Sequence, residues 1–254
     1  MRVHSQKAPC LTVSCQPDRA EMGRAAAGLV HDRLLWLLGQ QEQVNMLFAA
    51  APSQNEFLDA LCSFSDVPWQ RVNALHMDEY IGLPRQAPQR FGQFLRRAVF
   101  DRLPFRTVHY LDGDAPDPEA ECARYAALLE QYPLDIACTG IGENGHIAFN
   151  DPAVADFHDP KAVKQVALDE RCRMQQVHDG CFATLEAVPR HAFTLTVPAI
   201  LRSGFIVCVV PGRAKAQAVR ETLYGPVSEA CPASILRTHP QAHLYLEPES
   251  AALL

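Results

Sequence analysis

The stretch Leu134-Asp-Ile-Ala-Cys-Thr-Gly-Ile-Gly-Glu-Asn-Gly-His-Ile-Ala-Phe-Asn-Asp-Pro152 decides how this chain is organised. It opens with a short apolar run, from Leu134 to Cys138, which is typical of a buried strand. Three glycines and a histidine follow this run: Gly140, Gly142, Gly145 and His146. Glycine lets the backbone approach a ligand closely, and ligands of open α/β sheets bind at the carboxyl ends of strands. The stretch therefore predicts a strand followed by a ligand-binding loop.

This loop allows three interpretations. Its Gly-x-Gly-x-x-Gly spacing, Gly140 to Gly145, matches the dinucleotide-binding fingerprint, but that fingerprint opens a helix, and Asn150-Asp151-Pro152 would end a helix early. A purely structural glycine turn is the second interpretation, because glycine clusters are common in loops. The third is a catalytic loop, since an imidazole, an amide and two carboxylates, Glu143 and Asp151, fall within nine residues. We favour the catalytic loop.

Composition places the chain among ordinary globular proteins. Its 254 residues are 48% hydrophobic and 20% charged, which suits a single large α/β domain over residues 1–254. The net charge of −6 and the lack of Lys/Arg runs argue against a nucleic-acid partner. A small anionic substrate is compatible with this charge, because a few local cations can hold a phosphate. No apolar run reaches the length of a membrane-spanning helix, so we expect no membrane partner.

Cysteine and histidine usage bears on compartment and metal content. The segment from Met1 to Gln16 is polar and lacks the apolar core of a signal peptide. Nine cysteines are scattered singly: Cys10, Cys15, Cys62, Cys122, Cys138, Cys172, Cys181, Cys208 and Cys231. Their odd number, without a signal segment, favours free thiols in a cytoplasm over disulfides. The spacing gives no zinc pattern, so we expect no metal site and assign none of the ten histidines to one.

Apolar periodicity predicts helices and strands in alternation. After an irregular leader, helices are expected over 19–41, from Phe57 onward, and over 91–100, 119–131, 213–219 and 233–236. Strands are expected over 44–51, 72–77, 108–111, 134–138, 191–197, 205–210 and 243–246. Residues 152–171 are polar and irregular, as lids and binding loops often are. The alternation predicts a doubly wound, mostly parallel, Rossmann-like sheet with helices on both faces.

Two turns at predicted strand ends carry polar residues. Pro52-Ser-Gln-Asn55 leads into a helix, whose N-terminus can bind an anion. A simple capped turn, with Ser53 or Asn55 as the N-cap, explains these residues equally well. Asp78 and Glu79 follow the strand over 72–77. They are either solvated turn residues or include a general base, and the residue types alone leave both open.

Cations that could hold a phosphate come from the second half of the chain. Arg171 and Arg173 could bind a phosphate in a bidentate manner, although such pairs more often form surface ion pairs. Lys215 is expected in the first turns of a helix that follows a glycine turn. A lysine is unfavourable there for the helix dipole, so a bound anion would explain it better than packing does.

Three motifs carry a family resemblance: Met77-Asp-Glu-Tyr-Ile-Gly-Leu-Pro84, Gly140 to Pro152, and the weaker Gly212-Arg-Ala-Lys-Ala216. With them the chain resembles the glucosamine-6-phosphate deaminase (isomerase) family, which is related to 6-phosphogluconolactonases. Order and spacing agree from about the first helix to the end. The lactonase branch has Asp-Glu-Arg where this chain has Asp78-Glu79-Tyr80, and it continues the histidine loop with Ala-Ser-Leu-Phe. Both differences favour the deaminase branch.

The resemblance implies conversion of glucosamine 6-phosphate to fructose 6-phosphate and ammonia, in amino-sugar metabolism, without a metal or organic cofactor. Ring opening moves a proton between the ring oxygen and the C1 hydroxyl, and His146 is the candidate because imidazole titrates near neutrality. Isomerisation removes the C2 proton beside a carbonyl, and Asp78 matches the family's base. Asp151 and Asn144 would orient His146, and Asp151 would also favour its charged form.

The resemblance also implies a substrate and phosphate site built from Ser53, Gln54, Gly142, Arg173 and Lys215. Lys215 matches the family's phosphate lysine well, whereas the spacing around Arg173 differs from that of the phosphate arginine. Three features depart from the family pattern: Asn144 replaces a familiar Asp, Asp151 replaces a typical Glu, and Phe48-Ala-Ala-Ala-Pro-Ser-Gln54 replaces a Gly/Thr-rich turn.

Several alternatives stay open at this point. A 6-phosphogluconolactonase-type hydrolase and a galactosamine-6-phosphate isomerase would use the same scaffold. A non-catalytic sugar-phosphate sensor is motivated by the altered first loop and by Asn144. A homo-oligomer is compatible with the resemblance, and the residues leave the oligomeric state, an allosteric site and the sugar epimer undecided.

Overall fold

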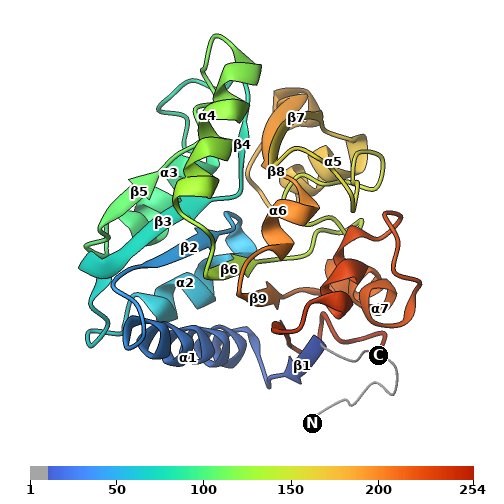
Figure 1. The fold of residues 1–254 in the computed structure, drawn as a ribbon. Helices are drawn as coiled ribbons and strands as arrows, with labels where there is room; N and C mark the ends of the chain where they lie inside the picture. The colour runs from blue at the N-terminus through green and yellow to red at the C-terminus, as the bar shows by residue number, and fades with distance from the viewer. Residues whose placement is uncertain (1–10) are drawn as a thin grey trace.

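A parallel sheet runs through the centre of the computed structural model, which describes residues 11–254 (Figure 1). Within these residues it has seven strands in the order β1-β10-β9-β6-β2-β3-β5, and every neighbouring pair is parallel. The strands are β1 (Leu11–Cys15), β2 (Val44–Phe48), β3 (Val72–His76), β5 (Thr107–His109), β6 (Ile136–Thr139), β9 (Phe205–Val210) and β10 (Ala242–Leu246). The doubly wound, mostly parallel fold is thus confirmed. The predictions for Met1 to Cys10 lie outside the described residues.

Helices cover both faces of this sheet (Figure 1). The α-helices of residues 11–254 are α1 (Arg19–Leu38), α2 (Asn55–Leu61), α3 (Phe91–Leu95), α4 (Pro118–Gln131), α5 (Glu170–His178), α6 (Val197–Leu201) and α7 (Ala216–Tyr224), of which α5 lies beside the small sheet described below. Shorter helical turns are η1 (Pro52–Gln54), η2 (Trp69–Arg71), η3 (Arg96–Phe100), η4 (Leu185–Ala187), η5 (Arg213–Lys215) and η6 (Pro232–Thr238).

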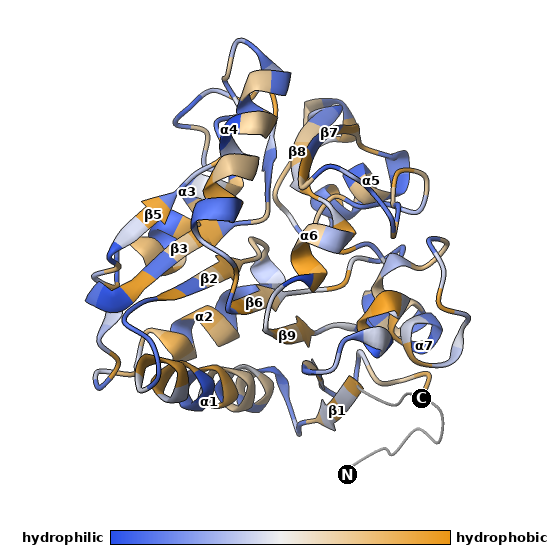
Figure 2. Cartoon of the chain, in the orientation of Figure 1, coloured by the Kyte–Doolittle hydropathy of each residue, from blue (hydrophilic) through white to orange (hydrophobic). Residues whose placement is uncertain are grey.

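Side-chain alternation along the strands divides the core into two layers. In β2, Met46 and Phe48 pack with α1 and α2, whereas Leu47 between them packs with α4 and α7. Strands buried on both faces read as continuous apolar runs. Figure 2 accordingly shows mostly hydrophobic colour along β9, and both colours along α1, which has one face in solvent. Helix α1 begins at Asp18, whose carboxylate accepts the Glu21 N–H.

A second, antiparallel sheet of three strands was not predicted. Within residues 11–254 it has the order β4-β8-β7, formed by β4 (Asp78–Tyr80), β8 (His191–Leu195) and β7 (Val163–Ala167). Met77 joins the two sheets, because its N–H donates to Phe48 O at 3.3 Å and its carbonyl accepts the Leu195 N–H at 2.8 Å. Asp78 is therefore the first residue of the small sheet.

The sequence prediction was wrong in places where polarity hid an element. Strand β7 reads Val-Lys-Gln-Val-Ala, without the alternation that marks a half-buried strand. Helix α5 was missed because two of its buried side chains are glutamines, Gln175 and Gln176. Pro198 was read as the end of a strand, but it lies in the first turn of α6, where proline is well tolerated.

Boundaries and caps also differ from the prediction, and three of these differences concern the structure around the core. The leader contains β1, in which only Leu11 is buried. The helix expected over 91–100 changes after Leu95 into the π-helical turn η3. Neither Ser53 nor Asn55 is the N-cap of α2, because Gln54 occupies that position and makes no side-chain cap hydrogen bond.

Candidate active site

A small cavity of about 60 Å³ lies at the carboxyl ends of β2, β3 and β6. This is the edge of a parallel sheet where ligands of α/β proteins bind. The cavity brings together five of the predicted site residues, Ser53, Gln54, Asp78, Gly142 and His146. The Gly140–Gly145 segment is a loop with no helix after it, which removes the context that the dinucleotide fingerprint requires.

Asp78 and Glu79 are both buried, so neither is a solvated turn residue. Burial raises the pKa of Asp78 well above its usual range, and the neighbouring charge of Glu79 adds to the shift. Within residues 11–254 its Oδ1 has no hydrogen-bond partner. A carboxylate that lines a cavity without a protein partner is available to a ligand.

Glu79 is engaged with the main chain instead. Its carboxylate accepts the N–H groups of Tyr80, Phe91 and Gly92 at 2.8, 3.1 and 2.9 Å. Burial raises the pKa of Glu79 to about 7, although these three hydrogen bonds oppose the shift. Glu79 thus caps the start of α3, and Phe91 of that helix lines the cavity.

His146 is held against the glycine loop. A Cβ added at Gly142 would fall well inside contact distance of the His146 ring, so only glycine allows this approach. On the other side of the ring, Nδ1 lies 2.9 Å from Oδ1 of Asp151. Burial alone would raise the pKa of Asp151, but the contacts with His146 and Asn144 bring it below its usual value. Asp151 is therefore suited to keep a negative charge beside the imidazole.

Asn144 connects three groups. Its Nδ2 donates to Asp151 Oδ1 at 2.9 Å and to Asp169 Oδ2 at 3.2 Å, while its Oδ1 accepts the His146 N–H at 3.1 Å. A carboxylate has no proton to donate when it is ionised. An aspartate here would place a third negative charge between two others, so the amide suits this set of neighbours. Asn144 and Asp151 do not line the cavity and lie behind His146.

One cluster of potential metal donors occurs in residues 11–254. Single donor atoms of His146, Asp151 and Cys172 lie within 4.8 Å of one another. Burial and the nearby carboxylates raise the pKa of the Cys172 thiol far above its usual value. Since the thiolate is the form that binds metals, a thiol held protonated here is a poor ligand. The donor set does not favour a metal centre.

The polar side of the cavity comes from the turn after β2. Ser53 and Gln54 line it, and the Gln54 amide donates to Val209 O of β9 at 3.2 Å. This hydrogen bond ties the turn after β2 to β9, which lies beyond β6 in the sheet, without a glycine-rich turn.

Lys215 is buried at the last position of η5, beyond the lining residues. Within residues 11–254 its Nζ has no hydrogen-bond partner. Burial lowers the pKa of Lys215, and the charges of Asp179 and Glu143 partly oppose that shift. A buried ammonium without a partner is costly, and an anionic ligand would offset that cost.

Arg173 does not line this cavity and makes contacts with the main chain. Its Nη2 donates to Leu185 O at 2.6 Å and to Val188 O at 3.0 Å, so the guanidinium secures the turn after α5. It is absent from the cavity lining. The expected phosphate role for Arg173 stays a prediction: its Nη2 is engaged with main-chain carbonyls, whereas its buried Nε has no hydrogen-bond partner among the described residues.

Sequence reasoning missed the lining residues of α5. Gln175 and Gln176 face the cavity, and Gln175 Oε1 accepts the Glu143 N–H at 2.9 Å. Polar residues repeated without an apolar face could have indicated a helix that covers a polar site. Ala148 also lines the cavity and has a φ of 50°, a left-handed conformation that is uncommon for residues other than glycine. Such backbone strain often occurs at functional sites.

The fold is that of a doubly wound α/β protein. The site at the carboxyl edge of its sheet combines a buried carboxylate with a histidine paired to a second carboxylate, which are residue types suited to proton transfer. The family model of glucosamine-6-phosphate isomerases/6-phosphogluconolactonase matches residues 17–245. The chain belongs to this family.

Proteins named glucosamine-6-phosphate deaminase are similar to the chain over most of its length. A glucosamine-6-phosphate deaminase of Listeria monocytogenes serotype 4a (strain HCC23) is 37% identical over 212 residues, which are 84% of this chain and 88% of the relative. One of Bacillus thuringiensis (strain Al Hakam) is 39% identical over 183 residues, 72% of this chain and 68% of the relative.

Solved structures agree with the fold. A monomeric glucosamine-6-phosphate deaminase has a TM-score of 0.86 at 27% identity and covers 96% of this chain and 100% of its own. The 6-phosphogluconolactonase of Thermotoga maritima has a TM-score of 0.76 at 18% identity. The match covers 93% of this chain and 99% of the lactonase, and it supports the fold alone. None of the helices in residues 11–254 combines the length and apolar character that a membrane crossing needs.

Proposed function

We propose that this protein converts glucosamine 6-phosphate and water to fructose 6-phosphate and ammonia. Family membership and relatives that carry this name support the assignment. The observation that carries it is the pair of Asp78 and His146, which line one cavity from two different strand ends. An unpartnered carboxylate and an imidazole beside a second carboxylate supply a base and an acid for adjacent proton transfers.

His146 serves ring opening in this proposal. The ring oxygen must gain a proton while the C1 hydroxyl loses one, and a single imidazole can perform both transfers. Asp151 keeps the ring oriented, and Asn144 holds Asp151 in place. Gly142 leaves the space that the imidazole occupies.

Asp78 serves the isomerisation. Its carboxylate removes the C2 proton of the open-chain aldehyde, and the resulting enolamine gains a proton at C1. The product of these steps is a C2 imine, which water then hydrolyses to the ketone and ammonia. A raised pKa makes Asp78 a stronger base than an ordinary carboxylate and eases return of the proton.

The phosphate would lie between the turn after β2 and η5. Lys215 offers a buried ammonium without a protein partner in residues 11–254, and Ser53 offers a hydroxyl at the cavity wall. Together they supply the local positive charge and hydrogen bonds that a phosphate requires.

The cavity must open before a sugar phosphate can enter. Its volume of about 60 Å³ is far below the roughly 300–1,000 Å³ of typical ligand sites. Helix α5 closes the cavity with Gln175 and Gln176. Two hydrogen bonds tie the start of this helix to the catalytic loop: Asn144 donates to Asp169, and Arg171 Nη2 donates to Glu143 O at 3.0 Å. We infer that α5 moves away to admit substrate and returns to exclude bulk water.

Incubation of the purified protein with glucosamine 6-phosphate tests the proposal, with fructose 6-phosphate and ammonia both quantified. We expect both products in equal amounts, and a loss of roughly a hundred- to ten-thousand-fold in Asp78→Asn and His146→Gln. Product from galactosamine 6-phosphate alone would reassign the epimer, and no product from either sugar would refute the deaminase assignment. Acid release from 6-phosphogluconolactone without ammonia would indicate a lactonase.

The sensor alternative makes the opposite prediction for the same samples. A sensor would be stabilised by glucosamine 6-phosphate but would not turn it over, and Asp78→Asn would leave that behaviour unchanged.

The cytoplasmic location also stays a prediction, which cell fractionation tests.

A further inference from the structure

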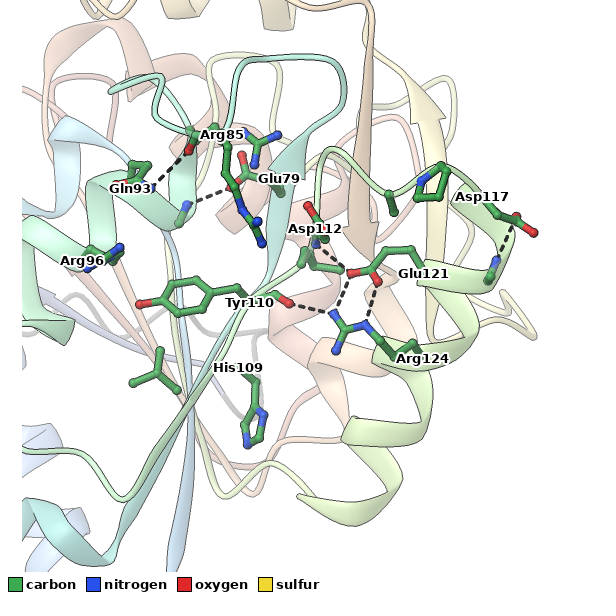
Figure 3. Close-up of a pocket in the computed structure, with 17 residues that line it drawn as sticks. Glu79, Arg85, Gln93, Arg96, His109, Tyr110, Asp112, Asp117, Glu121 and Arg124 are labelled. Carbon is green, nitrogen blue, oxygen red and sulfur yellow. Dashed lines mark hydrogen bonds and ion pairs between the residues drawn. The ribbon is translucent and has the colours of Figure 1, made fainter.

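A second cavity, of about 700 Å³, is lined by Gly92 of α3, next to Phe91, which lines the candidate active site (Figure 3). It is bounded by the loop before α3, by α3 itself, by the edge strand β5 and by the start of α4. Its volume falls within the range of sites for metabolite-sized ligands. The proposed deaminase reaction makes no use of it.

The acids of this cavity are already engaged. Glu79 accepts three main-chain N–H groups, and Glu121 accepts the Asp112 N–H and pairs with Arg124 at 2.7 Å. Asp117 caps α4, and Asp112 accepts the Asp114 N–H at 3.1 Å. These carboxylates therefore have little remaining attraction for a cationic ligand.

Two of its four arginines are engaged as well. Arg90 donates to Leu83 O and pairs with Asp114 at 2.7 Å, and Arg124 pairs with Glu121. The guanidinium groups of Arg90 and Arg124 therefore hold the cavity wall together and are occupied by protein partners.

The remaining donors, on Arg85, Arg96 and Tyr110, have at most one long contact with the protein. Arg96 has only a 3.5 Å contact with the exposed Asp101, and within residues 11–254 the Arg85 guanidinium makes no hydrogen bond or ion pair. Figure 3 shows the Arg85 side chain extending into the cavity between Glu79 and Tyr110. The Tyr110 hydroxyl likewise has no protein partner among the described residues. The cavity thus presents two guanidinium groups and a hydroxyl, which is the donor set for an anion.

We propose that this cavity binds a small anionic metabolite through Arg85, Arg96 and Tyr110. Its recognisable chemistry is a phosphate or carboxylate group, because guanidinium groups bind both in a bidentate manner.

The site shares a wall with the candidate active site. Phe91 lines the small cavity, and the next residue, Gly92, lines the large one. Glu79 holds both of their N–H groups and directly follows Asp78 in the chain. A side chain at Gly92 would press on both Tyr110 and Glu79, at 3.1 and 3.2 Å from its Cβ, so glycine keeps this wall thin. An occupant of the large cavity would therefore act on residues that touch the catalytic one.

Calorimetric titration at constant ionic strength tests the proposal, with inorganic phosphate and malonate as separate probes. All variants carry Lys215→Met, which removes the ammonium proposed to hold the substrate's phosphate. We expect at least one probe to bind, and the dissociation constant to rise at least about tenfold in Arg85→Ala and in Arg96→Ala. Arg106→Ala is the matched control, since Arg106 is exposed and does not line the cavity. Which probe binds distinguishes a phosphate from a carboxylate ligand.

Hydrogen exchange locates the bound probe. Exchange of the Phe91 and Gly92 amides should slow on addition of the probe, and Arg85→Ala should abolish this slowing. The proposal is overturned if neither probe binds, if both arginine variants bind as tightly as the control, or if the protection lies outside residues 83–96 and 108–124. The measurement scores binding and not turnover, so its result is independent of the deaminase assay.

Discussion

The Asn144 amide donates to Asp169 across a distance of 3.2 Å and to Asp151 at 2.9 Å. One side chain thus joins the carboxylate beside His146 to the N-cap of α5, since Asp169 Oδ1 accepts the Cys172 N–H at 2.6 Å. The amide at position 144 appeared in the sequence as a departure from the family pattern. In the structure it is the group that lets two carboxylates lie close together.

Asn144→Asp should therefore lower both stability and activity. A carboxylate at this position loses two hydrogen bonds and adds like-charge repulsion, which costs about 1–3 kcal/mol of unfolding free energy. Asp169→Asn in the same chain should restore part of the loss, because an amide at position 169 can donate to the new carboxylate. Denaturant unfolding of both single variants and the double variant gives the coupling energy. Additivity of the two changes within about 0.5 kcal/mol would show that the residues are not coupled.

Gly142→Ala should impair catalysis far more than folding. The new methyl group collides with the His146 ring, which must turn away from its position beside Asp151. We expect kcat to fall by roughly a hundredfold or more, in line with loss of an acid–base group. Gly28→Ala is the control, since that Cβ meets nothing within 4 Å and lies inside α1, where alanine stabilises by about 0.5–1 kcal/mol. Unchanged kcat in Gly142→Ala would contradict the packing described.

Lys215→Met should raise KM without destabilising the protein. Removal of a buried, unpartnered ammonium relieves a desolvation cost, so the unfolding free energy should stay equal or increase. The loss of a phosphate contact should raise KM at least about tenfold. Steady-state kinetics and thermal unfolding of this variant, beside the exposed Lys161→Met, separate the two effects. A large drop in melting temperature with unchanged KM would assign Lys215 a structural role instead.

Glu79 should make stability depend on pH in a defined direction. Its pKa rises from 4.5 to about 7 on folding, so the folded protein holds this proton more tightly than the unfolded chain. The resulting stabilisation is full below about pH 4.5 and is lost as the pH rises to about 7, by at most roughly 3 kcal/mol.

The difference in unfolding free energy between wild type and Glu79→Gln isolates this contribution. The difference should decline from pH 4.5 to about 7 and be flat on either side. Titrating groups distant from Glu79 affect both proteins alike and cancel, whereas Asp78 does not, because the Glu79 charge contributes to its raised pKa. A difference that stays constant over the whole range would mean that Glu79 titrates normally.

Arg173→Met should affect stability and leave substrate binding intact. Its two hydrogen bonds to Leu185 O and Val188 O secure the turn after α5, and their loss leaves two part-buried carbonyls without this partner. A lower melting temperature with KM within about twofold of wild type is expected, because an unpaired buried group costs about 1–3 kcal/mol. A tenfold higher KM would indicate that Arg173 contacts the phosphate of the substrate.

The large sheet was predictable because its strands are apolar on both faces. Runs such as Phe205 to Val210 have only one reasonable interpretation, and the glycine loop after Thr139 marks the site that they lead to. Asp78 and His146 could be paired from sequence because both follow strands of one parallel sheet, whose carboxyl ends meet at one edge.

The cover of the site was not predictable on the same grounds. Helix α5 buries glutamines and a cysteine against polar partners, so its sequence has no apolar face to detect. The position of Arg173 depends on carbonyls 12 and 15 residues away along the chain, which no spacing rule identifies. The second cavity likewise arises from segments that meet only in the fold.

The position of Met77 between the two sheets makes the base sensitive to their alignment. A rocking of the small sheet by even a fraction of an ångström would carry the Asp78 carboxylate with it, while His146 stays with the loop after β6. Substitutions that loosen the packing of β7, which pairs with β8 and not with β4, should then reduce turnover before they reduce stability. The junction at Met77 therefore sets the separation between Asp78 and His146, and with it the distance over which protons move.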